Sequence, residues 1–174
     1  MNKISTIGLI GLLIAATVNA QTVFVKQSLI DGKVQISLPS GYNALAKSEI
    51  EKDFPDPEYS PSVIFRDGKN GASLKIVLEN NQVTATEIGQ FKSWRVSRML
   101  KDTTLKVLSH DLKNINDRKI GIIKVNYPNI QRYHQYFFTS LDGRLILFIL
   151  ECSSAEILNK EFEFDQIMNS LLIR

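Results

Sequence analysis

Residues 133–150 read YHQYFFTSLDGRLILFIL, and the stretch changes character at Asp142-Gly143. Before this pair, aromatic and polar residues are mixed; after it, the chain is almost continuously apolar. Asp-Gly readily adopts the positive φ angles of a two-residue turn, so the stretch predicts a β-hairpin. The strands of such a hairpin are antiparallel.

A two-residue turn also predicts the register of this hairpin. Alternate residues of 144–152 point to opposite faces of the strand, and both sets are apolar. A strand that is apolar on both faces is expected to be covered on both faces. The cross-strand pairs predicted from the turn outward are Leu141 with Arg144, Phe137 with Phe148, His134 with Glu151 and Tyr133 with Cys152.

The rest of the chain reads as further hairpins and helices. A second Asp-Gly pair, Asp31-Gly32, predicts another tight turn. Thr84 and Glu87 match a capping box at the start of the longest central helix. The predicted strands are 23–30, 33–38, 62–65, 73–79, 104–112, 119–127, 132–140 and 144–152, and the predicted helices are 44–52, 85–100 and 155–170.

These elements predict an α+β domain in which an antiparallel β-sheet is covered by helices on both faces, an α/β/α sandwich. In the last helix, Leu158, Phe162 and Met168 fall near one stripe, which we expect to face the core. In the central helix, basic and apolar residues interleave on the helical wheel, whereas a membrane-surface helix would separate them. We therefore predict a core-packed helix with Trp94 inside, and a basic patch for an acidic partner is the alternative. The basic residues are Lys92, Arg95, Arg98 and Lys101.

Residues 37–42, SLPSGY, follow the first predicted hairpin and resemble the LP-x-G-aromatic opening of the PsbP-like fold. The later order of elements is similar too, down to the closing helix that ends in NSLLI. The fold group includes an extrinsic photosystem subunit, a nuclear protein that binds the GTPase Ran, and chaperones for secreted effectors. The resemblance implies a PsbP-like fold and a role in binding another protein. It carries over no functional residue, because the group shares no catalytic motif.

The first twenty residues have the pattern of a secretory signal peptide: Lys3, the apolar run 7–16, then small or aliphatic residues up to Ala20. The apolar run is too short for a membrane span, which needs about 20 residues. We expect one domain over residues 21–174, exported to the periplasm of a Gram-negative cell or otherwise secreted. The net charge of +3 does not call for a nucleic-acid partner.

Few residues are suited to catalysis. The chain has one cysteine and two histidines, and it lacks a G-x-S-x-G turn. We expect Cys152 to be free and buried. His134 and Glu151 could form a pH-sensitive contact, a weak metal site or a hydrolytic pair, but a cross-strand polar pair is the simpler interpretation. We predict that the protein is not an enzyme and has no cofactor and no metal site.

The acidic loop, residues 53–61 (DFPDPEYSP), has three prolines and is expected to be irregular. Its carboxylates match no calcium loop, so a solvated loop is the simplest interpretation. Aromatic residues beside charge in a rigid loop also suit a protein interface. The predicted partner-binding residues are Asp53, Phe54, Asp56, Glu58 and Tyr59.

The favoured function is that of a non-catalytic exported protein that binds a partner protein, in an accessory or immunity-type role. The alternative is a carrier of a small apolar ligand or lipid in the cell envelope, with an apolar cleft between the sheet and a helix as the binding site. Aromatic residues of strand 132–140 motivate it, namely Tyr133, Tyr136 and Phe138.

Overall fold

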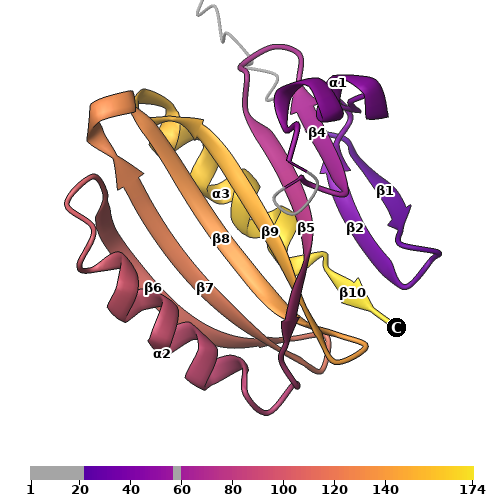
Figure 1. Cartoon of the computed structure of the whole chain (residues 1–174). Helices are drawn as coiled ribbons and strands as arrows, with labels where there is room; N and C mark the ends of the chain where they lie inside the picture. The colour runs from indigo at the N-terminus through magenta and orange to yellow at the C-terminus, as the bar shows by residue number, and fades with distance from the viewer. Residues whose placement is uncertain (1–21, 57–59) are drawn as a thin grey trace, which may run out of the picture.

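A computed structural model describes residues 22–56 and 60–174 of the chain (Figure 1). The predicted signal peptide and two of the predicted partner-binding residues, Glu58 and Tyr59, lie outside the described residues. Among the residues described, no helix has both the length and the apolar character that crossing a membrane requires.

Two antiparallel sheets and three α-helices make up the described chain. The large sheet has the order β3-β4-β5-β9-β8-β7-β6, and the small one has the order β1-β2-β10. The strands of the large sheet are β3 (Tyr42–Ala44), β4 (Val63–Asp67), β5 (Ser73–Gln82), β6 (Lys106–Ile115), β7 (Arg118–Tyr127), β8 (Arg132–Leu141) and β9 (Arg144–Ser153). The small sheet has β1 (Phe24–Leu29), β2 (Val34–Pro39) and β10 (Leu172–Ile173). The helices are α1 (Lys47–Asp53), α2 (Ile88–Met99) and α3 (Ile157–Asn169), with short 3-10 turns at Pro128–Ile130 and Ser154–Glu156.

The β8–β9 hairpin forms in the predicted register, including the pairs of Leu141 with Arg144 and His134 with Glu151. Asp142 and Gly143 take the positive φ angles, 52° and 76°, that the tight turn needs. The rings of Phe137 and Phe148 stack across the two strands with centroids 4.7 Å apart. The prediction from the opening stretch is confirmed.

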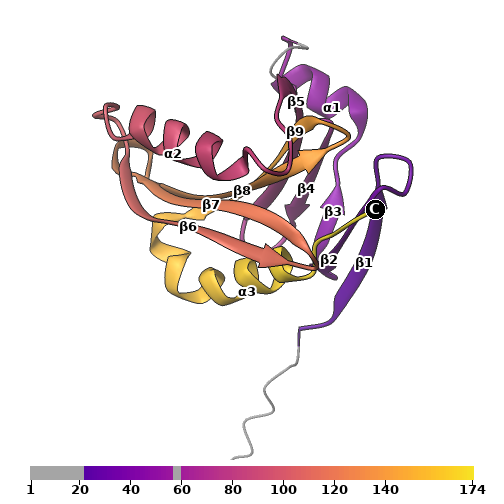
Figure 2. The ribbon, with the colours of Figure 1, turned by 90° about the horizontal axis from the view of Figure 1, so that it is seen from below.

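The two faces of the large sheet are covered by different elements (Figure 2). On one face, Ile88 and Val96 of α2 pack with Ile123 of β7 and Leu147 of β9. On the other face, α3 packs on the sheet through residues such as Phe164. The chain is therefore an α+β protein built on antiparallel sheets.

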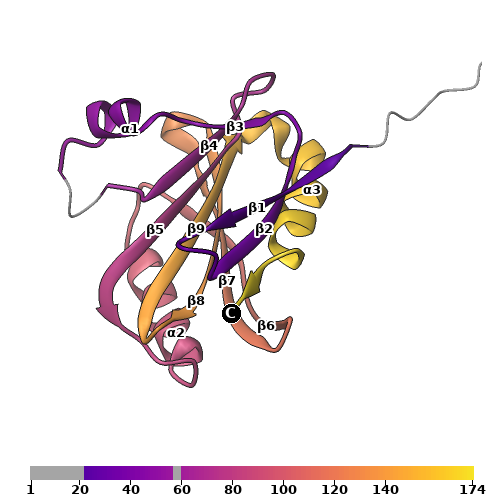
Figure 3. The ribbon, with the colours of Figure 1, turned by 90° about the vertical axis from the view of Figure 1, so that its right-hand side faces the viewer.

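The predicted α/β/α sandwich holds only in part, because the small sheet shares the face that α3 occupies. Val34, Ile36 and Leu38 of β2 belong to the same buried cluster as Phe164 of α3 and Phe148 of β9. Figure 3 shows β1 and β2 crossing the direction of the large-sheet strands. A strand pair, and not a second helix, thus closes this part of the core.

The stripe predicted for the last helix is wrong for two of its three residues. Met168 is buried, but Leu158 is 90% exposed and Phe162 is 73% exposed. The buried stripe of α3 instead runs through Lys160, Phe164, Ile167 and Met168. These positions have the i, i+4, i+7, i+8 spacing of one helix face. A lysine therefore begins the inward stripe, which an apolar pattern cannot reveal.

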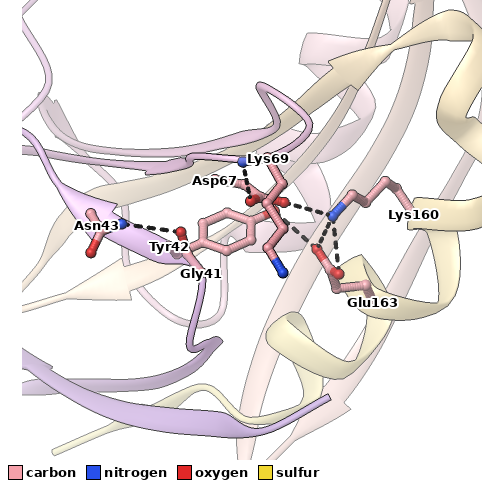
Figure 4. Close-up of polar contacts among 7 residues, drawn as sticks. All are labelled: Gly41, Tyr42, Asn43, Asp67, Lys69, Lys160 and Glu163. Carbon is pink, nitrogen blue, oxygen red and sulfur yellow. Dashed lines mark hydrogen bonds and ion pairs between the residues drawn. The ribbon is translucent and has the colours of Figure 1, made fainter. Parts of the chain in front are cut away.

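An ion cluster explains the inward lysine (Figure 4). Lys160 Nζ lies 3.1 Å from Asp67 Oδ2 on β4 and 2.9 Å from Glu163 Oε1, and the Lys160 and Asp67 side chains are 7% and 9% exposed. Burial alone would lower the pKa of Lys160, but its bonds to Glu163 and Asp67 raise it above the usual range. Tyr42 donates its hydroxyl to Glu163 Oε1 at 3.0 Å. The aromatic residue of SLPSGY thus helps to tie β3 and β4 to α3.

Candidate functional site

The described part of the acidic loop begins at the end of α1. Asp53 Oδ2 lies 4.0 Å from the guanidinium of Arg66 on β4. Phe54 is partly buried, with the Lys75 ammonium 5.5 Å from the centre of its ring. Asp56 is exposed. Phe54 is therefore held by packing, and the role of the loop in partner binding stays a prediction.

The predicted pair of His134 and Glu151 has a third member, which the sequence did not reveal. His134 Nε2 lies 3.5 Å from Glu151 Oε2, and Lys75 Nζ on β5 lies 2.8 Å from the same oxygen. The side chains of His134 and Glu151 are each 16% exposed. Lys75 reaches the pair because β5 is the neighbour of β9 in the large sheet.

The contacts of His134 continue across the sheet toward α2. Its Nδ1 lies 3.1 Å from the hydroxyl of Tyr136, which lies 3.0 Å from the hydroxyl of Tyr127 on β7. The guanidinium of Arg95 on α2 lies 5.6 Å from the centre of the Tyr136 ring. We call this line of contacts the polar row; its members are Lys75, Glu151, His134, Tyr136 and Tyr127. The row connects Phe54, after α1, with Arg95 on α2.

The polar row is arranged for hydrogen bonding, with each protonation state set by its surroundings. Burial lowers the pKa of His134, and the negative charge of Glu151 opposes this shift only in part. Burial alone would raise the pKa of Glu151, but the bond and charge of Lys75 lower it below its usual range. At neutral pH the row therefore holds a neutral imidazole beside an ionised carboxylate. Over the described ranges, no group of three or more histidine, cysteine, aspartate or glutamate residues could hold a metal.

The low pKa of His134 predicts a loss of stability as the pH falls. Its ordinary pKa is 6.5, so below this pH the unfolded chain binds the proton more readily than the folded protein. The contribution of His134 to the free energy of unfolding should have its full value above pH 6.5. Below this pH the contribution should decline until the imidazole of the folded protein is also protonated. In His134→Gln this decline should be smaller. Urea unfolding at a series of pH values measures it, and equal declines in both proteins would contradict the pKa assignment.

Cys152 is free and buried, as predicted. Burial raises the pKa of its thiol to about 11, so the thiol is protonated at neutral pH and is a poor nucleophile. Cys152 therefore serves as a small apolar side chain of the core.

The prediction that Trp94 lies in the core is wrong, because Trp94 is 50% exposed. The buried residues of α2 are Ile88 and Val96. Trp94 is two residues before Val96, and two residues turn a helix by about 200°, so the two side chains point to opposite sides. With the interleaved pattern of α2, the sequence could not show which residues face the sheet.

Trp94 is supported from below by a column of packed rings, which we call the aromatic column. The ring centroids of Trp94 and Phe91 are 5.4 Å apart, and Phe91 meets Phe138 of β8 edge to face, also at 5.4 Å. Phe138 lies over Gly121 of β7 so closely that a Cβ there would come within 2.4 Å of the ring. On the outer side, the guanidinium of Arg98 lies 5.4 Å from the centre of the Trp94 ring. The column holds Trp94 in a fixed position at the surface.

The surface around Trp94 is basic and has hollows on both sides of the indole. One hollow, of about 280 Å³, is bounded by Trp94, Phe91 and Gln82, and another, of about 470 Å³, by Trp94, Arg98 and Asp102. The α2 sequence has three basic residues and no acidic one. We define the Trp94 surface as the exposed part of this helix and its end, with the residues Trp94, Arg98, Leu100 and Lys101. Lys92 is only partly exposed and lies in line with the buried Ile88 and Val96, so it is not part of this surface. Arg95 is less available, because its Nη1 lies 3.4 Å from Glu79 Oε1.

The aromatic residues that motivated a carrier function are part of the core. Tyr133, Tyr136 and Phe138 are all buried, the first on the α3 face of the sheet and the other two on the α2 face. A hollow of about 710 Å³ lies instead beside α1 and is lined by residues such as Ile50, Phe54 and Val63. The predicted sheet–helix cleft is therefore filled by these side chains.

Comparison with known proteins identifies the fold. No protein-family model matches the sequence, and no curated protein matches it. The solution structure of cyanobacterial PsbP (CyanoP) from Synechocystis sp. PCC 6803 is similar, with 16% sequence identity, a TM-score of 0.57, and coverage of 94% of this chain and 100% of that chain. The chain thus has the PsbP-like fold that the SLPSGY stretch suggested.

Two further structures share this fold. The Pseudomonas aeruginosa protein PA94, of unknown function and a putative regulator, has 13% identity and a TM-score of 0.51, over 87% of this chain and 97% of that chain. The Ran-binding protein Mog1p of Saccharomyces cerevisiae has 9% identity and a TM-score of 0.50, over 87% and 96% of the chains. At these identities the similarity establishes the fold alone.

Proposed function

We propose that this protein is a non-catalytic binding protein whose Trp94 surface recognises an acidic region of a partner protein. The observation that carries the proposal is the half-exposed Trp94, held in place by the aromatic column and bordered by basic residues. Tryptophan and arginine are the residues that most often dominate binding energy at protein interfaces. The hollows beside the indole offer room for an apolar side chain of the partner.

One of the fold neighbours supports a binding role. Mog1p is itself a Ran-binding protein, and it has the same fold at 9% identity. The proposal assigns no catalysis to the polar row, because the side chain of His134 is only 16% exposed. With the signal-peptide pattern of residues 1–20, these observations favour an exported accessory or immunity-type protein. Protein recovered from the cell envelope or medium should begin at Gln21.

The acidic loop is a second contact zone in this proposal. Helices α1 and α2 lie on the same side of the large sheet (Figure 2), and the polar row connects them. A partner seated on the Trp94 surface could therefore extend toward Asp53, Phe54 and Asp56. If Asp56→Lys leaves partner capture unchanged, the loop has no part in binding.

Truncation of Trp94 is expected to remove most of the affinity for the partner. Capture from envelope and secreted fractions, quantified by mass spectrometry, should be compared for the wild-type protein and for Trp94→Ala. A central interface tryptophan contributes about 2 kcal/mol, so the affinity should fall roughly 30-fold. Ile130→Ala is the control, because Ile130 is also an exposed apolar residue but lies in the turn before β8. Equal capture by the wild type and Trp94→Ala would contradict the proposal.

A second candidate function, carriage of a small apolar ligand, is favoured by the hollow beside α1. Its volume of about 710 Å³ falls within the range of ligand pockets, roughly 300–1,000 Å³. Native mass spectrometry of protein purified from its own host tests this function. A ligand-free mass throughout would exclude carriage and leave protein binding.

A further inference from the structure

The outer side of α3 exposes two large apolar residues one helical turn apart. Leu158 and Phe162 are separated by four positions, so they lie next to each other on one face of the helix. They are among the most exposed large apolar residues of the described chain, at 90% and 73%. Water-exposed leucine and phenylalanine that adjoin in this way are typical of interaction surfaces.

The charge around these two residues is negative. The α3 sequence contains the acidic residues Glu161, Glu163 and Asp165, and its single basic residue, Lys160, is buried in the ion cluster. Glu161 and Asp165 both lie near Lys124, at 2.6 and 3.7 Å, but their side chains remain 46% and 37% exposed. We call the exposed part of this helix the α3 surface; it consists of Leu158, Glu161, Phe162 and Asp165.

The α3 surface is complementary to the Trp94 surface in charge and in apolar content. Helix α2 has basic residues and no acidic ones, and Trp94 is exposed at its centre. The two helices have similar lengths, 12 and 13 residues, or about 18 and 20 Å. An acidic helix with two exposed apolar residues is the kind of partner that the Trp94 surface is suited to bind.

We infer that the Trp94 surface of one molecule binds the α3 surface of a second copy. The inference rests on the proposed function, because it assigns an occupant to the same surface. Because α2 and α3 lie on opposite faces of the large sheet (Figure 2), each bound molecule still presents a free Trp94 surface or a free α3 surface. The contact is therefore head-to-tail, and it builds chains or closed rings.

The contact is small, and part of it is electrostatic. A single pair of helices of this length buries less than the roughly 1,200 Å² of a stable specific interface. Self-association should therefore be weak and concentration-dependent. Salt should weaken it further, because exposed charges are screened over a Debye length of about 8 Å at physiological ionic strength.

Blocking one surface at a time tests the head-to-tail contact. Trp94→Ala combined with Arg98→Glu blocks the Trp94 surface, and Leu158→Ser combined with Phe162→Ser blocks the α3 surface. Sedimentation velocity at low salt, up to several hundred micromolar, should show wild-type mass rising with concentration and each blocked protein staying monomeric. An equal mixture of the two blocked proteins should form a dimer and nothing larger, because each supplies the surface that the other lacks. Ile130→Ser should assemble like the wild type.

Three results would overturn the inference: a monomeric wild type, blocked proteins that assemble like the wild type, or a mixture that either stays monomeric or grows beyond a dimer. Circular dichroism confirms that the blocked proteins are folded; if the serine variant is not, Leu158→Ala with Phe162→Ala replaces it. A monomeric wild type whose partner capture still depends on Trp94 would reject self-association and leave the proposed function intact. Self-association without Trp94-dependent capture would support the head-to-tail contact and reject the proposed function.

Discussion

Lys160→Met is expected to lower the free energy of unfolding by about 3–5 kcal/mol, the usual cost of removing one partner from a buried ion pair. Without the ammonium, Asp67 and Glu163 remain as neighbouring carboxylates in a largely buried site. The negative charges then repel each other and lack their main hydrogen-bond donor. Urea unfolding at neutral pH measures the change.

The control for Lys160→Met is Lys47→Met, which removes an exposed pair between Lys47 and Glu51 on α1. That pair should contribute no more than about 0.5 kcal/mol. Adding Asp67→Asn and Glu163→Gln to Lys160→Met should recover part of the lost stability, because no uncompensated charge remains. A loss below about 1 kcal/mol in Lys160→Met would show that the cluster is solvated, and would contradict this account of α3.

Gly121→Ala is expected to cost about 3 kcal/mol, near the upper end for overpacking a core. A Cβ at this position would come within 2.4 Å of the Phe138 ring, which is fully buried and packed on Phe91. The ring has to move, and the movement passes through Phe91 to Trp94. Because Trp94 is the only tryptophan, its fluorescence should also change while the protein remains folded.

Gly68→Ala is the matched control for Gly121→Ala. Gly68 lies in the turn after β4, and a Cβ there would meet no atom within 4 Å. Its unfolding free energy should stay within about 0.5 kcal/mol of the wild type. If Gly121→Ala were equally mild and left the Trp94 fluorescence unchanged, the aromatic column would not be the support of Trp94.

Local signals were sufficient to predict the central hairpin. Asp142-Gly143 determines both the turn and the register, so the pairing of His134 with Glu151 follows from counting residues. The PsbP-like fold was also predictable, from SLPSGY and the order of elements. In the structure, the tyrosine of this stretch donates a hydrogen bond to Glu163, which gives the motif a physical role.

Features that depend on distant parts of the chain were not predictable. The strand β10 is only two residues long and pairs with β2, near the other end of the chain. Lys75 joins His134 and Glu151 only because β5 pairs with β9. Its one sequence signal was a lysine between the apolar residues Leu74 and Ile76 of an alternating strand.

The errors on the two long helices have related physical causes. On α3, Lys160 turns inward because Asp67 of β4 is there to pair with it, and this rotation brings Leu158 and Phe162 outward. On α2, basic and apolar residues interleave, so the pattern did not indicate that Trp94 faces outward. Because of these two errors, the sequence did not reveal the Trp94 surface or the α3 surface, on which the functional proposals rest.

The most direct test of the account is hydrogen–deuterium exchange of the protein over residues 21–174, free and bound to its captured partner. The central claim is that the Trp94 surface binds this partner. We expect slower exchange of the backbone amides of residues 90–101 in the complex, and unchanged exchange in the turn that contains Ile130. Unchanged exchange over residues 90–101, with protection elsewhere, would contradict the claim and place the binding site on another surface.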